Sequence, residues 1–133
     1  MFVAAAAGDR QLSNILVVEA DAIVRNLLIG VLSRHGFTVY EAATASEAVT
    51  VCQSLKDQSL DLLIADHVTA GRVTTEVILA ACPKTKVLHI SDWAFETVQH
   101  AQALLPGSSF LQKPFTAVEL LHNVNDLLNP RMH

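Results

Sequence analysis

The sequence contains three residues of the types that a transferred phosphoryl group needs around it. Asp66, Ser91 and Lys113 each stand at or just after the end of a short strand-like segment. A carboxylate can attack phosphorus only when a cation offsets the charge repulsion, and Mg²⁺ with oxygen ligands is the usual cation. An ammonium group can neutralise a second phosphoryl oxygen, and a hydroxyl can hydrogen-bond a third. These residue types therefore point to phosphoryl transfer onto Asp66.

Each of these residues also has a simpler role when it is considered alone. Asp66 could begin a turn, and Lys113 could be a solvated surface charge. Asp21, which follows the first apolar run, could cap a helix. A site requires that the side chains come together, so the elements that carry them decide between the two interpretations.

Five segments have the pattern of β-strands. Two of them, at residues 14–18 and 61–66, are nearly continuous apolar runs, which predicts strands covered on both faces. The segment at residues 37–41 alternates between apolar and polar side chains. The remaining two predicted strands are residues 86–90 and 109–112.

Helical patterns separate these strands. Apolar residues recur at helical spacing between residues 21 and 35, and Gly36 follows as a typical C-terminal cap. Thr44 and Thr116 each have a glutamate three residues later, which is the capping-box pattern. We therefore expect helices to begin after both threonines, the first of them running to about Lys56.

Two further helices are predicted with weaker signals. A short helix at residues 72–81 stops at Cys82-Pro83, because proline cannot continue a helix. Asp92 could cap another helix over residues 93–105. Strands that alternate with helices predict an α/β fold, an open parallel sheet wound with helices on both faces, in one domain.

In such a sheet, ligands bind at the carboxyl ends of the strands, where the order of the strands reverses. Glu19 and Asp21 follow the first strand, and Asp66 ends the third. Ser91 follows the fourth strand and Lys113 the fifth. The predicted fold thus brings carboxylates, a hydroxyl and an ammonium group to one edge.

Composition limits the classes of function. The 133 residues are 51% hydrophobic and suffice for one domain; we expect a flexible leader at residues 1–12, the domain at 13–129 and a tail at 130–133. No apolar run reaches the length of a membrane span, so we expect a cytoplasmic protein without a membrane partner. A net charge of −4 without a basic cluster argues against direct nucleic-acid binding. Cys52 and Cys82 are expected to be reduced thiols.

Four segments together resemble the signature of response-regulator receiver domains, with particular likeness to chemotaxis regulators. They are Ile15–Asp21, Asp61–Asp66, Val87–Ser91 and Lys113-Pro114-Phe115. The resemblance covers about residues 13–129 and implies a flavodoxin-like (βα)5 sheet with the strand order 2-1-3-4-5. It also implies a two-component phosphorelay protein that at most catalyses its own phosphorylation and dephosphorylation.

The resemblance implies a role for individual residues. Asp66 is similar to the phosphorylated aspartate, and Ser91 to the switch hydroxyl that holds the phosphoryl group. Lys113 is similar to the lysine that pairs with this group, and its bond to Pro114 is expected to be cis. Phe110 stands where the family has its switch aromatic.

The metal-binding part of the pattern is incomplete. The family has two adjacent acids after the first strand, and here the second position is Ala20, whose methyl group cannot bind Mg²⁺. The implied ligands are Glu19, Asp66 and the backbone carbonyl of Val68, with Asp21 as a further candidate one position late. Losing an inner ligand should weaken Mg²⁺ binding by at least the roughly 10–100-fold typical of outer-shell changes.

The resemblance also implies partners. A histidine kinase or phosphotransfer protein would donate the phosphoryl group. The face formed by the fourth helix, fifth strand and fifth helix would dock a downstream protein or a second copy of the chain. Trp93, Phe95 and Phe110 are the candidates for this face, because Trp is favoured at interface hot spots.

Two alternatives remain open beside the phosphorylated regulator. A pseudo-receiver would keep the fold and act as an interaction module without phosphate, as Ala20 and the unusual segment His67–Arg72 suggest. A flavodoxin-like binder of a nucleotide or flavin would share the topology. The first strand is not followed by a glycine-rich phosphate loop, which weighs against the flavodoxin-like binder.

Overall fold

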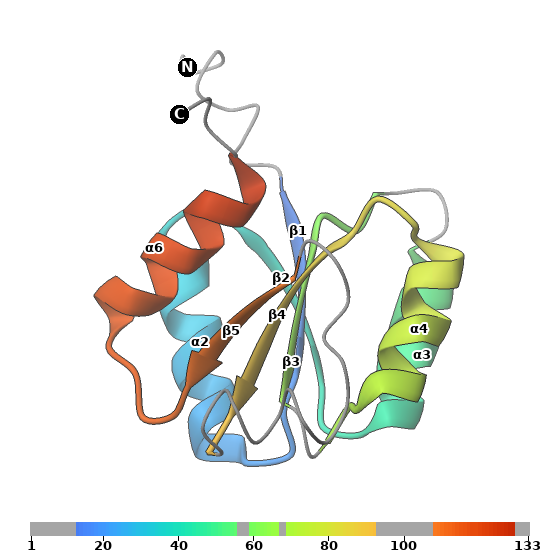
Figure 1. The fold of residues 1–133 in the computed structure, drawn as a ribbon, viewed down its shortest axis with the longest axis horizontal. Helices are drawn as coiled ribbons and strands as arrows, with labels where there is room; N and C mark the ends of the chain where they lie inside the picture. Colours follow the sequence, from blue (N-terminus) through green and yellow to red (C-terminus); the bar gives the residue numbers. More distant parts are fainter. Residues whose placement is uncertain (1–12, 56–58, 67–68, 93–107, 130–133) are drawn as a thin grey trace.

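The computed structural model describes residues 13–55, 59–66, 69–92 and 108–129. Its centre is a five-stranded parallel sheet in the order β2-β1-β3-β4-β5, as predicted (Figure 1). The strand bounds agree with the predicted ones to within one residue. The strands are β1 (Asn14–Val18), β2 (Thr38–Ala42), β3 (Leu62–Asp66), β4 (Lys86–Ser91) and β5 (Ser109–Gln112).

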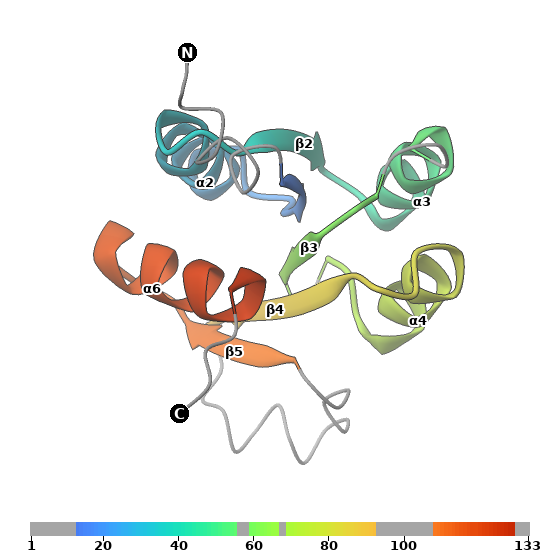
Figure 2. The same ribbon diagram turned by 90° about the horizontal axis from the view of Figure 1, so that it is seen from above.

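Helices cover both faces of the sheet. Figure 2 shows α2 and α6 on one side, and α3 and α4 on the other. Their bounds are α2 (Ala22–Arg34), α3 (Ala45–Ser54), α4 (Arg72–Ala81) and α6 (Ala117–Leu128). The helix predicted at residues 93–105, the leader at 1–12 and the tail at 130–133 lie outside the described residues. Within the described part, no helix is both long enough and apolar enough to span a membrane.

The two faces of the sheet form two separate halves of the core. All five residues of β3 are buried, because helices cover this central strand from both sides. One half lies under α3 and α4 and the other under α2 and α6. The buried strand residues of the first half are Leu16, Val18, Ala42, Leu63, Ala65 and Val87. Those of the second are Ile15, Val17, Leu62, Ile64, Leu88 and Ile90.

Local side-chain caps fix where the helices begin, and therefore where the loops after the strands end. Asp21 caps α2, because its Oδ1 accepts hydrogen bonds from the backbone nitrogens of Ile23 and Val24. Thr116 forms the complete predicted capping box with Glu119. Gly36 follows α2 with a φ of 91°, a left-handed conformation that favours glycine.

The capping box predicted at Thr44 forms with one difference. Thr44 accepts from the backbone nitrogen of Glu47 at 3.1 Å, but the Glu47 carboxylate accepts from the backbone of Ala43 instead of Thr44. The helix also ends earlier than predicted, at Ser54 and not near Lys56. The C-cap residue Leu55 is buried in the core, so the chain turns inward there.

Candidate functional site

The site lies at the point where the strand order reverses. β1 and β3 are neighbours in the sheet, with Val18 beside Ala65, so the chain positions of Glu19 and Asp66 are also adjacent. From here β1 leads to α2 on one face, while β3 leads to α4 on the other (Figure 2). This divergence leaves a place for a ligand at the carboxyl ends of the two strands.

Lys113 connects the two carboxylates at this point. Its Nζ lies 2.7 Å from Oε1 of Glu19 and 3.0 Å from Oδ1 of Asp66. All three side chains are largely shielded from solvent, with exposed fractions of 14%, 3% and 8% for Lys113, Glu19 and Asp66. Lys113 follows β5, so its side chain reaches past β4 to the ends of β3 and β1. One ammonium group is thus shared by two buried acids.

The backbone holds Lys113 in place at the end of β5. Its backbone nitrogen donates to the carbonyl of Ser91 at 2.7 Å, which joins the ends of β4 and β5. The peptide bond between Lys113 and Pro114 is cis, as expected.

The charge of Lys113 depends on its two acidic neighbours. Burial acts to lower the pKa of Lys113, whereas the hydrogen bonds and charges of Glu19 and Asp66 act to raise it. The acidic neighbours prevail, and the pKa of Lys113 lies above its ordinary value of 10.5. The lysine therefore remains cationic at neutral pH and supplies a fixed positive charge beside Asp66.

Thr69 holds the second oxygen of Asp66, a role that was not predicted from the sequence. Oδ2 of Asp66 accepts from the backbone nitrogen of Thr69 at 3.0 Å and from its hydroxyl at 2.8 Å. The same hydroxyl oxygen accepts from the backbone nitrogen of Ala20 at 3.2 Å. Thr69 thus links the loop after β3 to the loop after β1. The only signal in the sequence was a hydroxyl residue three positions after Asp66. The contact of that hydroxyl with Ala20 could not be read from the sequence.

Arg25 supports the loop after β1, a role that sequence reasoning also missed. Its guanidinium donates to the carbonyls of Glu19 at 2.8 Å and Ala20 at 3.3 Å. It also forms an ion pair with Glu41 at 3.1 Å. These contacts fix the backbone that carries Glu19. The ion pair depends on the position of β2 beside α2, which a local sequence pattern does not predict.

The described residues do not make a complete Mg²⁺ site. Glu19 and Asp66 are both engaged with Lys113, and Ala20 contributes only a methyl group. One oxygen of Asp21 caps the start of α2, which is the simpler role considered for this residue in the sequence. Within the described part of the chain, no three acidic, histidine or cysteine side chains gather closely enough to hold a metal ion. The carbonyl of Val68 lies outside the described residues.

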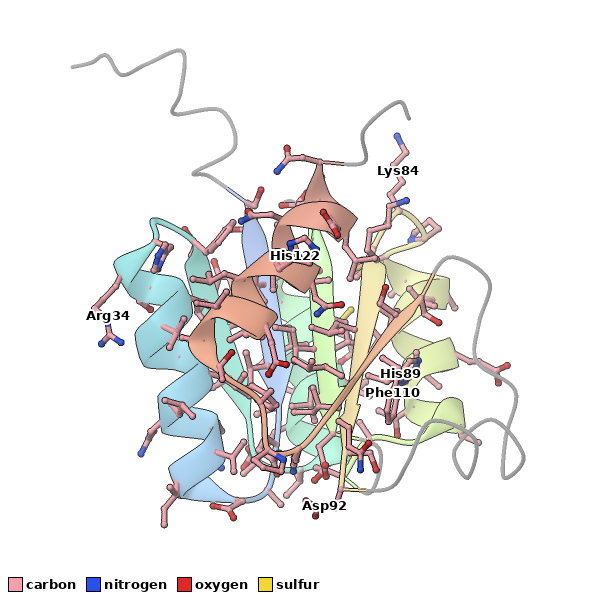
Figure 3. The ribbon with its side chains drawn as sticks, turned by 60° about the vertical axis from the view of Figure 1, so that its left-hand side comes forward. Arg34, Lys84, His89, Asp92, Phe110 and His122 are labelled. Atoms are coloured by element: carbon pink, nitrogen blue, oxygen red, sulfur yellow. The ribbon has the colours of Figure 1, made fainter. Side chains whose placement is uncertain are left out.

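Of the other residues singled out in the sequence, Ser91 and Phe110 lie within the described part of the chain. Ser91 is buried at the end of β4, one position beyond the residue that pairs with Asp66. Phe110 pairs with His89 in the register of β4 and β5, and Figure 3 shows the two side chains near one another. Figure 3 also places Asp92 at the site end of β4 and Lys84 at the opposite end. His67, Trp93 and Phe95 lie outside the described residues.

Comparisons with known proteins place this geometry in a family. The sequence matches no protein-family model. It is 28% identical over 123 residues to the regulatory protein VirG of Agrobacterium tumefaciens, covering 90% of this chain and 45% of VirG. It is 26% identical over 119 residues to the sensor kinase CckA of Brucella abortus, covering 87% of this chain and 12% of CckA. The chain therefore spans less than half the length of these relatives.

The structural comparison decides the family. A response regulator receiver protein from Sinorhizobium medicae superposes with a TM-score of 0.77 and 25% identity, covering 91% of this chain and 98% of that protein. This chain is a receiver domain of the response-regulator type. The receiver fold also superposes on a CheX–CheY–BeF₃–Mg²⁺ complex from Borrelia burgdorferi, with a TM-score of 0.76, 22% identity and coverage of 86% of this chain and 88% of that chain. At that identity the likeness shows the fold alone.

Proposed function

We propose that this receiver domain accepts a phosphoryl group on Asp66 from a phosphorylated histidine and passes the signal on through its surface. The observation that carries the proposal is the ion pair of Lys113 with Asp66 at 3.0 Å, beside Glu19. The Lys113 ammonium group offsets part of the charge repulsion that an anionic donor meets at this buried acid.

In the proposed step, one carboxylate oxygen of Asp66 forms a bond to phosphorus while the bond from phosphorus to the donor nitrogen breaks. The electron pair of that bond returns to the imidazole. Lys113 neutralises charge on the transferred group, and the Ser91 hydroxyl hydrogen-bonds one of its oxygens. Phe110 would move with Ser91, so the phosphorylated state would present a different surface to its partners.

The test of this proposal is the intact mass of the chain after incubation with acetyl phosphate. We expect wild type to gain one phosphoryl group and Asp66→Asn to gain none. Asp126→Asn is the matched control, because Asp126 is 66% exposed on α6, and it should react like wild type. Equal phosphorylation of the Asp66→Asn variant would contradict the proposal.

The pseudo-receiver remains the second candidate, and the crowding of Asp66 favours it. Lys113 and Thr69 already engage both oxygens of this acid, and Ala20 removes a metal ligand. In this alternative the domain binds its partners without phosphate. A chain that takes up no phosphoryl group from acetyl phosphate, yet retains its partner, would support it over the first proposal.

We further propose that Mg²⁺ binds only weakly, because position 20 lacks an acid. The substitution Ala20→Asp should lower the Mg²⁺ dissociation constant by roughly 10–100-fold, measured by titration calorimetry. Ala20 is exposed, so the fold should tolerate the change. Ala80→Asp, at an exposed position of α4, is the control that should leave the constant unchanged. If Ala20→Asp also leaves it unchanged, position 20 does not limit metal binding.

The proposed partners use two surfaces. The phosphodonor protein would contact the start of α2, where Ile23 is 81% exposed and Leu27 is 52% exposed. These apolar side chains follow directly after the site loop, and large exposed apolar residues together mark interaction sites. The downstream partner or a second copy would use the face that includes Phe110.

A further inference from the structure

Two thiols that are far apart in the sequence meet between α3 and α4. The Sγ atoms of Cys52 and Cys82 lie 3.3 Å apart, although 30 residues separate them. Cys52 is 2% exposed on α3, and Cys82 is half-buried at the end of α4. Cys82 is held there by its backbone nitrogen, which donates to the carbonyl of Ile78 at 2.8 Å. The pair therefore results from the packing of the two helices and not from a local motif.

We propose that Cys52 and Cys82 form an oxidative modification site, at which a peroxide joins the two thiols in a reversible disulfide between α3 and α4. The sulfur atoms need to approach from 3.3 Å to the roughly 2.05 Å of a disulfide bond. The two helices already pack side by side on one face of the sheet (Figure 2). Bond formation therefore has to bring the two sulfur atoms closer by little more than about 1 Å.

The surroundings of the two thiols set the order of the reaction. Burial, together with the hydrogen bond and charge of Cys82, raises the pKa of Cys52 to about 12. Cys52 therefore remains a thiol, and the more exposed Cys82 is the residue that meets the oxidant. The 3.3 Å contact between the two sulfur atoms allows the Cys52 thiol to hydrogen-bond the Cys82 sulfur.

With hydrogen peroxide the two steps balance as follows. The Cys82 thiolate attacks one peroxide oxygen, the O–O bond breaks, and the departing hydroxide takes up a proton to give water and a sulfenic acid. The Cys52 sulfur then attacks the sulfur of the sulfenic acid, the S–O bond breaks, and the released oxygen leaves as a second water with the Cys52 proton. Both sulfurs are oxidised, and the peroxide is reduced.

This site is separate from the phosphoryl site. Cys82 follows the last residue of α4, whereas the loop from Asp66 leads into the first residue of the same helix. Figure 1 shows the two ends of α4 at opposite ends of the sheet. The inference therefore does not rest on the proposed phosphorylation and would stand if that proposal failed.

The test uses the full reduced chain, treated with increasing hydrogen peroxide and then denatured in excess iodoacetamide. We expect a monomer that has lost the mass of two hydrogen atoms, takes up no alkyl group, and has a peptide map joining the segments of Cys52 and Cys82. Dithiothreitol should restore two alkylation sites. Sulfinic acid at Cys82 with Cys52 still free, or a link only between chains, would overturn the proposal.

Two variants and one stability measurement sharpen the result. In Cys52→Ser, a dimedone probe should trap the sulfenic acid at Cys82, while Cys82→Ser should leave Cys52 unreacted at the same dose. Since Cys52 is buried, Cys52→Ala serves if the serine variant does not fold, and the wild-type result stands without either. Oxidised wild type should melt on the order of 10 °C higher than reduced wild type. A lower melting temperature with the link formed would show that the native packing does not accommodate it.

Discussion

At one end of the sheet, two buried carboxylates share a single ammonium group. Lys113 contacts Glu19 and one oxygen of Asp66, while Thr69 donates two hydrogen bonds to the other oxygen of Asp66. Asp66 is thereby fixed at both oxygens before any ligand arrives. At the scale of single residues, Asp66 is thus held at both oxygens, and one ammonium group offsets part of the charge of two buried acids.

Thr69→Val tests whether the threonine positions the acceptor. The substitution keeps the shape of the side chain but removes the 2.8 Å hydrogen bond to Asp66. We expect the rate of phosphorylation by acetyl phosphate to fall roughly 10–100-fold, because the carboxylate loses orientation. Thr69→Ser, which retains the hydroxyl, should react at nearly the wild-type rate in the same mass assay. A valine variant that reacts as fast as wild type would show that the hydroxyl has no positioning role.

Lys113→Gln tests the shared ion pair through the free energy of unfolding. The variant leaves two buried acids without their cation, so it should be about 3–5 kcal/mol less stable than wild type in urea at pH 7. Lys84→Gln is the control, because Lys84 is exposed and lies at the far end of β4 (Figure 3). It should differ from wild type by less than about 0.5 kcal/mol.

The pH dependence of this difference has a definite sign. The pKa of Lys113 is raised in the folded chain above its ordinary 10.5, so its stabilising effect is fully present below that pH. It is lost as the pH rises through the higher folded value. The stability gap between wild type and Lys113→Gln should therefore be constant near neutrality and narrow above pH 10.5. A gap that stays constant up to the alkaline limit of reversible folding would contradict the ion pair.

At the scale of elements, α2 has two tasks. Its N-cap, Asp21, and its side chain Arg25 fix the loop that carries Glu19. Its outer surface leaves Ile23 and Leu27 exposed beside that loop. One helix thus both shapes the site and presents an apolar surface next to it.

Leu27→Lys tests this surface. The change should slow transfer from a phosphorylated histidine-phosphotransfer protein at least about tenfold, because it places a charge at the centre of the contact. Phosphorylation by acetyl phosphate should be unchanged. Val77→Lys on α4 is the matched control, with 48% exposure against 52% for Leu27, and should transfer normally. Equal loss in both variants would remove α2 as the specific contact.

The success of sequence reasoning differed between elements and site. β1 and β3 were predictable because burial on both faces requires continuous apolar runs, and α6 because its capping box is a local pattern. The ordering of strand ends also placed Asp66 and Lys113 correctly at one edge. The roles of Thr69 and Arg25 were not predictable, because both depend on hydrogen bonds to the loop after β1. Thr69 is 49 residues from its partner Ala20, and Arg25 is 6 residues from its partner Glu19. The contact of Cys52 with Cys82 likewise depends on how α3 and α4 pack.

At the scale of the whole molecule, the fold brings four of the described site residues to one end of the sheet. Glu19, Asp66, Ser91 and Lys113 come from four strand ends, and each strand is anchored in a core that covers both faces. The cysteine pair is displaced toward the other end of α4. Phosphoryl chemistry and thiol oxidation would therefore act on different parts of one rigid scaffold.

The central claim is that the strand ends form a single pocket for a tetrahedral phosphoryl group around Lys113. The most direct measurement is amide NMR of the domain during titration with beryllofluoride, a mimic of this group. We predict that the largest shifts occur at Glu19, Thr69, Ser91 and Lys113, and that Lys113→Gln abolishes them while Lys84→Gln does not. Shifts of wild type that spare these four residues, or that persist in full in Lys113→Gln, would contradict the account.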